Sequence, residues 1–313
     1  MTRAIAYTEF GGPEVLHEIE VPDVAPGPGE VAIRVEAAGV NPIDAKLRAG
    51  LRASAAIVEP RRVGSDGAGV VTAVGDGVDG FRVGDAVVFG AAHGAYADEV
   101  AVRAENVHPR PADVSAAEGA ALGIPVGTAY QTLRSLAVAT GDTLLVHGGS
   151  GAVGQAVVQF AVLWGATVIA TSSPARFERL RRLGATPVEY GDGLADRVRA
   201  AAPQGITVAI DAAGTDEALH TSLELVPDHR RIATLVRGAD AAGLGIRAFS
   251  GGSPEPLTPQ QQLWRAEADP VVLALLAAGA FSVELGPEFA LADAAQAHAA
   301  LAAGVSGKIT LIP

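Results

Sequence analysis

The chain has 313 residues, of which 49% are hydrophobic and only 4% aromatic, and its formal net charge is −12. This length is enough for two domains with a sizeable core. The acidic balance, without any basic stripe, argues against nucleic acid or an anionic membrane surface as a partner. The absence of cysteine excludes disulfides, thiolate metal sites and cysteine nucleophiles.

Metal binding and membrane insertion also find little support in the sequence. The seven histidines are scattered, and no two have the i, i+4 spacing of a helical zinc motif. We therefore expect no metal, the alternative being a site built from distant His, Asp and Glu residues. No apolar run approaches the roughly 18 residues that span a bilayer, and Met1–Ala6 predicts a strand rather than a signal peptide. We expect a cytoplasmic protein with no membrane partner.

Residues 1 to about 107 have the pattern of a β domain. Short runs rich in Val, Ile and Ala alternate with Gly/Pro turns, which is typical of strands joined by turns. Four such runs are Ala4–Tyr7, Glu30–Val35, Gly69–Val74 and Asp85–Phe89. They predict a mostly antiparallel sheet, folded as a distorted barrel.

From about Ser115 the pattern changes to alternating strands and helices. Ser115–Glu118 has the form of a helix capping box, and residues 120–136 predict a helix that breaks at Pro125. The expected strands are 144–147, 167–170, 187–189, 207–210 and 231–235. The expected helices are 155–164, 176–183, 194–201 and 217–225. Regular alternation of this kind predicts a parallel sheet covered by helices on both faces.

The carboxyl-terminal part predicts two further helices, over 270–279 and 292–303, and a final strand over 308–312. The final strand has no obvious partner nearby in the sequence. We therefore expect it to return to the amino-terminal β domain. Before these elements, the Gly-, Ser- and Pro-rich segment 250–257 predicts a loop near the substrate.

The most informative segment runs from the strand at 144–147 through a glycine turn into a helix. Glycines at 148, 151 and 154, with Gly149 added, form the turn, and a second strand follows at 166–170. This βαβ unit is typical of a dinucleotide site, because backbone N–H groups and the helix N-terminus bind the pyrophosphate. The alternative is a structural turn, since glycine-rich turns also occur in loops that bind nothing.

The residues after the second strand favour NADPH over NADH. NAD sites normally end this strand with Asp or Glu, which binds the ribose 2′-hydroxyl. This chain has Thr171-Ser172-Ser173-Pro174-Ala175-Arg176 there instead. Hydroxyls and a guanidinium suit a 2′-phosphate, because Arg offers several charge-assisted donors to a dianion. The alternative is that Arg176 is an ordinary residue in the first turn of a helix.

Seven motifs are spread in order over nearly the whole chain. They are Gly39–Asp44, Val63–Val71, Phe81–Val87, Gly94–Ala97, Gly127–Tyr130, Gly148–Gly154 and Gly307–Leu311. Together they resemble the zinc-independent medium-chain dehydrogenases/reductases, in the quinone oxidoreductase and enone (alkenal) reductase group. The resemblance implies an α/β fold, in which a GroES-like, mostly β catalytic domain (1–120 and 266–313) is interrupted by a Rossmann domain with a doubly wound parallel sheet (121–265). It also implies a homodimer.

The same resemblance assigns residues to the site. Zinc alcohol dehydrogenases have a Cys ligand near position 41, where this chain has Asn41, so the resemblance is to the metal-free branch, whose interdomain cleft holds NADPH and substrate. It places Asn41 and Lys308 near the nicotinamide and Thr128 near the diphosphate–ribose half. The residues implied for the pyrophosphate are Ser150, Gly151, Ala152, Val153 and Gly154. Those implied for the 2′-phosphate are Ser172, Ser173, Arg176 and Tyr190, although Tyr190 is equally consistent with a half-buried aromatic at a strand end.

Lys46 departs from the pattern of many quinone reductases, which have tyrosine at this position. The form N-P-x-D-x-K at 41–46 is similar instead to the enone and alkenal reductases. In that setting Lys46 either hydrogen-bonds the nicotinamide ribose or a substrate carbonyl, or merely pairs with Asp44. A second departure is Asp66, where glutamate is more usual.

The resemblance implies an NADPH-dependent oxidoreductase that transfers hydride to a quinone or an α,β-unsaturated carbonyl. Negative charge then builds on the conjugated oxygen, and Asn41 and Lys46 are the expected catalytic donors to it. Two alternatives stay open, an enoyl-thioester reductase and a non-catalytic NADPH-binding protein. The expected partner is a small-molecule quinone or enone, whereas an enoyl-thioester reductase would need room for a long acyl carrier.

Overall fold

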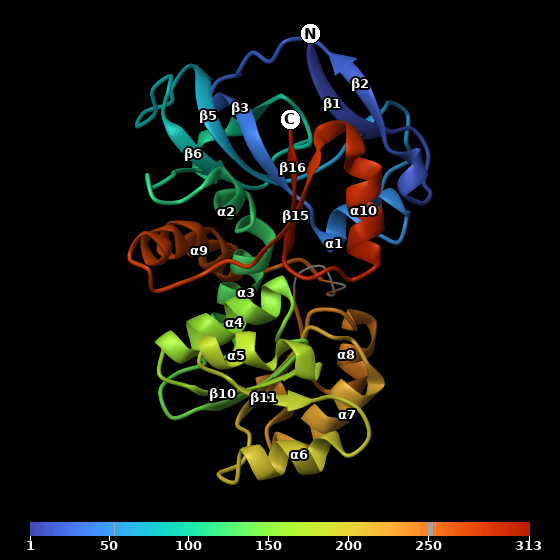
Figure 1. The fold of residues 1–313 in the computed structure, drawn as a ribbon, viewed down its shortest axis with the longest axis vertical. Coiled ribbons are helices and arrows are strands. Elements are labelled where there is room, and N and C mark those ends of the chain that lie inside the picture. Colours follow the sequence, from blue (N-terminus) through green and yellow to red (C-terminus); the bar gives the residue numbers. More distant parts are fainter. Residues whose placement is uncertain (53, 250–252, 254) are drawn as a thin grey trace. The chain divides into compact units, whose positions relative to one another are not determined.

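The computed structural model describes residues 1–52, 54–249, 253 and 255–313. These residues form two compact units, one made of 1–124 with 269–313 and the other of 125–268, and Figure 1 traces the chain through both. Residues 250–252 and 254 of the expected substrate loop lie outside the described residues. Each unit has its own sheet and its own core, and each is described by itself below.

The first unit is built on a mostly antiparallel sheet, as the sequence predicts. Its strand order is β15-β16-β3-β5-β6-β8, and β7 also pairs with β3. Every pairing is antiparallel except that of β15 with β16. The strands are β3 (Glu30–Gly39), β5 (Asp66–Val74), β6 (Ala86–Phe89), β7 (Glu99–Arg103), β8 (Val107–Pro109), β15 (Leu285–Ala290) and β16 (Lys308–Ile312). A smaller sheet joins β1 (Thr2–Tyr7), β2 (His17–Val21) and β4 (Arg61–Arg62).

The last strand returns to the amino-terminal part of the chain, which confirms that expectation. β16 pairs antiparallel with the end of β3, with Thr310 opposite Gly39 and Leu311 opposite Ala38. This pairing brings Lys308, at the start of β16, to the segment that follows β3. A buried apolar cluster holds the strands together, with Ile33, Phe89 and Leu311 among its members.

Three helices of the first unit bear on the site or its supports. They are α1 (Pro42–Arg48), α2 (Ala116–Ala120) and α10 (Ala294–Ala302). The expected capping box starts α2, because the Ser115 hydroxyl accepts a hydrogen bond from the Glu118 amide (3.2 Å) and the Ser115 amide donates to the Glu118 carboxylate (2.9 Å). Helix α1 begins directly after β3, so its first turn lies beside β16.

The second unit is a parallel α/β sheet, again as predicted. Its strand order is β11-β10-β9-β12-β13-β14, the order of a doubly wound dinucleotide-binding fold. The strands are β9 (Thr143–His147), β10 (Thr167–Ser172), β11 (Thr186–Glu189), β12 (Val208–Asp211), β13 (Ile232–Thr234) and β14 (Arg247–Ala248). Five helices lie wholly in this unit: α4 (Ala152–Leu163), α5 (Phe177–Arg182), α6 (Leu194–Ala201), α7 (Asp216–Leu225) and α8 (Gly238–Leu244). Helices α3 (Gly123–Ser135) and α9 (Pro259–Ala277) include residues on both sides of its boundaries in the chain.

One expectation about proline is wrong, and one expected helix starts earlier than the sequence indicates. Helix α3 does not break at Pro125 but runs unbroken from Gly123. Pro125 is its third residue, where an amide has no partner within the helix, so proline costs no hydrogen bond there. Helix α9 begins at Pro259, earlier than the expected start at 270, and has Pro270 in its interior.

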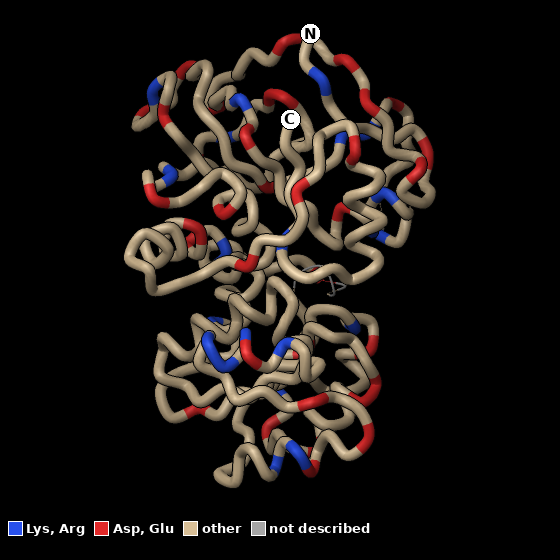
Figure 2. The backbone as a smooth tube through the Cα atoms, viewed as in Figure 1, with Lys and Arg blue, Asp and Glu red and all other residues tan. Residues whose placement is uncertain are grey.

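The described chain has neither a basic stripe nor a membrane-spanning helix, in line with the expectations from its composition. Figure 2 shows basic positions interspersed with acidic ones along the described chain. Among the described residues, no helix is both long and apolar enough to span a bilayer.

Candidate functional site

The glycine turn between β9 and α4 has a backbone that side chains would block. Gly148 has a φ of +73°, in the left-handed region that favours glycine. A Cβ on Gly154 would lie 2.3 Å from the Gly148 carbonyl oxygen and 2.7 Å from the Gly149 Cα. Because both neighbours are backbone atoms, the helix can approach the strand this closely only with glycine at 154.

The other side of this turn is open. Gly151, the N-cap of α4, is exposed, and a Cβ on it would meet only the Gly148 oxygen, at 3.6 Å. Ala152 is exposed, and Ser150 and Val153 are partly buried. The first amides of a helix have no partner within it and carry partial positive charge. The turn therefore fits a pyrophosphate group, which would fill the space in front of Gly151.

Gln155, which the sequence analysis did not single out, supports this turn. Its side-chain amide donates to the Ser150 carbonyl (2.8 Å), and its oxygen accepts from Nε of Arg179 (2.8 Å). The side chain thereby ties the turn to helix α5. Glutamine about one turn into an apolar helix gave no signal in the sequence, since its role depends on α5 lying beside α4.

The end of β10 presents hydroxyls and a guanidinium, without a carboxylate. Ser173 and Arg176 are partly buried. Ser172 is buried, and its hydroxyl donates to the Ser173 carbonyl (3.1 Å). The sheet register pairs Ser172 with Glu189, so Ser173 and Tyr190 leave neighbouring strands side by side. Tyr190 is 56% exposed, which is compatible both with a residue beside the 2′-phosphate and with a half-buried aromatic at a strand end.

Thr128 lies in α3 and takes part in none of the described hydrogen bonds of the glycine turn. It is buried, with 4% of its surface exposed. Its neighbour Gly127 is packed against Arg265 of α9, where a Cβ would lie 2.9 Å from the arginine Cγ. The glycine thus allows two helices of this unit to pack closely at the level of Thr128.

Asn41 and Lys308, expected near the nicotinamide, are brought together in the first unit. The Lys308 ammonium donates to Oδ1 of Asn41, and Nδ2 of Asn41 donates to the Asp66 carboxylate (2.9 Å). Asp66 also accepts from the Ile124 amide at the start of α3 (2.8 Å). All three side chains are buried, and burial lowers the pKa of Lys308. The Asn41 amide is therefore already bonded at both ends.

A second chain of buried groups leads from Asp44. The Asp44 carboxylate accepts from the backbone amide of Asn41 (2.9 Å) and from the Tyr96 hydroxyl (3.1 Å). Nε2 of His298 lies 3.3 Å from the Tyr96 oxygen, and Nδ1 lies 3.1 Å from an Arg48 nitrogen. Since arginine only donates, Nδ1 accepts and Nε2 carries the proton. The hydrogen bonds therefore run in one direction, from Arg48 to Asp44.

Burial dominates the acid–base behaviour of this chain of groups. It raises the pKa of Asp44 to about 7, although the hydrogen bond from the backbone amide of Asn41 opposes the change. It lowers the pKa of His298 to about 4, with the Arg48 charge acting in the same direction. Burial also raises the pKa of Tyr96 well above its ordinary value. The site thus holds Asp44 close to its titration point at neutral pH.

Lys46 is placed differently from Lys308. It lies on α1, is partly buried, and has no ion-pair partner among the described residues. Among the described residues, Lys46 forms no ion pair with Asp44, whose carboxylate accepts instead from the backbone amide of Asn41 and from Tyr96. Over the described ranges, no three His, Asp or Glu side chains gather as a metal site requires.

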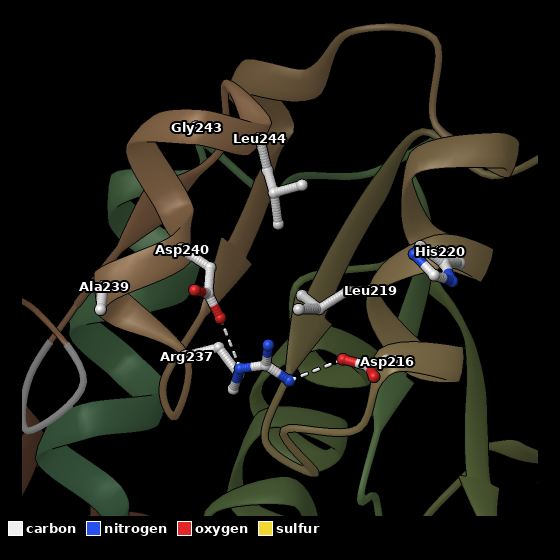
Figure 3. Close-up of a pocket in the computed structure, with 8 residues that line it drawn as sticks. All are labelled: Asp216, Leu219, His220, Arg237, Ala239, Asp240, Gly243 and Leu244. Atoms are coloured by element: carbon white, nitrogen blue, oxygen red, sulfur yellow. Dashed lines mark hydrogen bonds and ion pairs between the residues drawn. The ribbon is translucent and has the colours of Figure 1, made fainter.

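A surface pocket of about 420 Å³ lies between α7 and α8 of the second unit. Figure 3 shows Arg237 at its centre, hydrogen-bonded to Asp216 (2.8 Å) and Asp240 (2.5 Å). With its charge balanced by two carboxylates, Arg237 is a poor ligand for a phosphate. The pocket residues include none of the site residues expected from the sequence. They are Asp216, Leu219, His220, Arg237, Ala239, Asp240, Gly243 and Leu244.

Comparison with known proteins agrees with this architecture. One family profile, described as "Alcohol dehydrogenase GroES-like domain", matches residues 27–112, and another, described as "Zinc-binding dehydrogenase", matches residues 152–243. The expected pairing of a GroES-like domain with a Rossmann sheet is confirmed.

Individual relatives are quinone oxidoreductases. The quinone oxidoreductase of Rattus norvegicus is 41% identical over 186 residues, which cover 58% of this chain and 55% of that protein, so the chain spans about half the length of this relative. That of Pseudomonas aeruginosa is 32% identical over the full length of both chains. The solved structure of Escherichia coli quinone oxidoreductase complexed with NADPH is 25% identical, with a TM-score of 0.84 over 99% of this chain and 100% of that one. The chain therefore belongs to the quinone oxidoreductase group of the medium-chain dehydrogenase/reductase family.

Proposed function

We propose that the protein is an NADPH-dependent oxidoreductase that reduces a quinone or an α,β-unsaturated carbonyl compound. The observation that carries the proposal is the glycine turn at 148–154, open at Gly151, beside a strand end with Ser173 and Arg176 and no carboxylate. A family member that was solved with NADPH adds support.

The second unit is proposed to hold the cofactor. NADPH supplies a hydride when it is bound. The backbone from Ser150 to Gly154 binds its pyrophosphate, and Thr128 lies near the diphosphate–ribose half. Ser173, Arg176 and Tyr190 bind the 2′-phosphate. Ser172 contributes through its backbone position, since its hydroxyl proton is already shared with the Ser173 carbonyl.

The first unit is proposed to stabilise the charge that develops on the substrate oxygen. Lys46 is the catalytic donor, because it carries a positive charge and has no ion pair among the described residues. Asn41 becomes a positioning residue, since Lys308 and Asp66 already occupy its side-chain amide. A donor placed in advance contributes about 3 kcal/mol to such a step. The final proton comes from solvent, so the reaction needs no dedicated acid.

Turnover with a panel of acceptors tests the activity. Steady oxidation of NADPH with quinones or α,β-unsaturated ketones is the expected result. Preference for an enoyl thioester would assign the protein to that class of reductase. Binding of NADPH without turnover of any acceptor would identify a non-catalytic binding protein and contradict the proposal.

Replacing Arg176 tests the cofactor assignment. The Arg176→Ala variant should raise KM for NADPH by at least about ten-fold, since a charge-assisted contact to the 2′-phosphate is lost. KM for NADH should stay unchanged. Arg181→Ala is the matched control, because Arg181 is an exposed arginine of the neighbouring helix. By contrast, Lys46→Met should lower kcat with either cofactor. Equal losses with NADPH and NADH in Arg176→Ala would refute the phosphate contact.

We also propose a homodimer, which the family resemblance supports. Strand β14 ends the parallel sheet and pairs with β13. A molar mass of twice the chain's 31.5 kDa by light scattering is the expected result, and a mass of one chain would contradict it.

A further inference from the structure

A row of four buried polar side chains crosses the parallel sheet at the ends of its strands. His147, Asp211 and Thr234 are register partners on β9, β12 and β13. Thr171 extends the row onto β10, one residue after the pair Ala170 and Val146. All four side chains are at most 2% exposed. We name this set (Thr171, His147, Asp211 and Thr234) the polar row.

The polar row replaces the apolar core at one specific level of the sheet. Two residues earlier on the same strands lie Ile169, Leu145, Ala209 and Ile232, which are register partners and belong to one buried apolar cluster. Side chains two residues apart in a strand face the same side. The polar row therefore lies on the same face of the sheet as this apolar cluster. Apolar residues at these four positions would have avoided the cost of burying polar groups.

On β12 and β13 the polar row holds two backbone turns. Oδ1 of Asp211 accepts from the amides of Ala213 (2.9 Å) and Gly214 (2.8 Å). Its other oxygen accepts from the Thr234 hydroxyl (2.8 Å). The Thr234 oxygen in turn accepts from the amides of Val236 (3.2 Å) and Arg237 (2.9 Å). One carboxylate thus fixes the turns that follow two strands.

On β9 and β10 the polar row holds the glycine turn. The Thr171 hydroxyl accepts from the Gly148 amide (3.3 Å) and lies 3.4 Å from Nδ1 of His147. One proton is shared between that hydroxyl and Nδ1, and which of the two donates depends on the imidazole tautomer. Burial lowers the pKa of His147 to about 4, so the ring is neutral. Within the described structure, Nε2 is buried and has no hydrogen-bond partner.

We propose that the polar row is a positioning device for the cofactor, which sets the three backbone turns at 148–149, 213–214 and 236–237 in the conformation that binds the dinucleotide. In doubly wound sheets, ligands bind beyond the carboxyl ends of the strands, and these are the turns found there. Backbone groups can bind a ligand well only if their conformation is fixed beforehand. The proposal rests on the proposed function in so far as NADPH is the ligand.

Hydroxyl deletions at both ends of the row test the proposal. Thr171→Val and Thr234→Val keep the shape of the side chain and remove its hydrogen bonds. Thr143→Val is the matched control, because Thr143 is a buried threonine at the amino end of β9, where its hydroxyl accepts from Gln204 (3.2 Å). Thr171→Ser and Thr234→Ser restore the hydroxyl. The measurements are calorimetric Kd for NADPH and the unfolding midpoint of the unliganded protein.

All three valine variants should lower the unfolding midpoint, whereas only Thr171→Val and Thr234→Val should raise Kd for NADPH, by about ten-fold. The two serine variants should restore the affinity. Valine variants that bind NADPH as tightly as Thr143→Val would overturn the proposal while leaving the proposed function intact. An unmodified protein that does not bind NADPH would instead refute the proposed function.

Hydrogen exchange in the unmodified protein tests the proposal if a valine variant does not fold. Because the polar row fixes the three turns before NADPH binds, the amides of Gly148, Gly214 and Arg237, which donate to it, should exchange slowly in the unliganded protein. Exchange at these amides that is fast without NADPH and slow with it would show that the cofactor orders the turns, and would overturn the proposal.

Discussion

Each of the two units contains a buried polar cluster, and the two clusters are built on different principles. The first unit buries charges, with Lys308, Asp66, Asp44 and Arg48 linked through Asn41, Tyr96 and His298. The polar row of the second unit has a single carboxylate, Asp211, among hydroxyls and a neutral imidazole. The first cluster therefore depends on charge balance, and the second depends on hydrogen-bond geometry.

This difference separates two tasks within one protein. Buried charges keep a strong local field beside a reacting group, but removal of one partner leaves the others uncompensated. Neutral hydrogen bonds contribute less each and fix backbone conformation with little long-range field. A field suits the unit proposed to stabilise developing charge, and fixed turns suit the unit proposed to bind the cofactor.

Removing the cation of the charged cluster should produce the largest effect. Lys308→Met leaves Asp44 and Asp66 buried without their ammonium partner, and should lower the free energy of unfolding by about 3–5 kcal/mol. Lys46→Met, which replaces the other lysine of the chain, should change it by less than about 0.5 kcal/mol. Urea unfolding followed by circular dichroism measures both. Similar values for the two variants would show that the buried cluster does not rely on charge balance.

The charged cluster should also make stability depend on pH through Asp44. Its pKa is about 7 in the folded protein and 3.8 ordinarily. Between these values the folded carboxyl keeps a proton that the unfolded chain has released, so its stabilising contribution is lost as the pH rises towards 7. The parent's advantage over Asp44→Asn should therefore shrink by up to about 1.4 kcal/mol per pH unit across this range. Unfolding curves at pH 4 to 7 test this, and an advantage that grows with pH would contradict it.

The polar row should show a smaller effect of opposite sign. The pKa of His147 is about 4 in the folded protein and 6.5 ordinarily. Its contribution is present above pH 6.5 and is lost as the pH falls through 4, because the unfolded chain binds the proton more tightly. The parent's advantage over His147→Asn should therefore grow between pH 4 and 6.5.

Tryptophan fluorescence isolates this measurement, since both tryptophans, Trp164 and Trp264, lie in the second unit. His220→Asn is the control, because His220 is exposed on α7 of the same unit. Its difference from the parent should be small, because the side chain is exposed. A His147→Asn variant that behaves in the same way would show that the ring is not buried as a neutral group.

Local sequence patterns predicted most of the fold, because each reports on interactions within a few residues. The alternation of strands and helices after Ser115 gave the parallel sheet, and the capping box at Ser115–Glu118 formed as expected. The break at Pro125 was wrong, since proline is tolerated in the first turn of a helix and the position of that turn depended on where α3 starts.

The candidate site was predicted unevenly. The glycine turn could be recognised because its spacing is local, and the resemblance brought in Asn41 and Lys308, which the structure places in contact. Tyr96 and His298 were missed, since 202 residues separate them in the chain. The sequence contains only a weak sign of the polar row, because three apolar strands each end in a polar residue. These residues are His147, Asp211 and Thr234.

The sequence by itself determined the class of the fold, the glycine turn and the lack of a carboxylate after β10, because these depend on backbone conformation and residue type at neighbouring positions. The tertiary structure alone decided which polar groups share a buried environment. Sheet register and helix packing bring residues that are far apart in the chain within hydrogen-bonding distance. Examples are Arg48 with His298, and Thr171 with His147. Burial of those groups then sets their charge state, which no local pattern records.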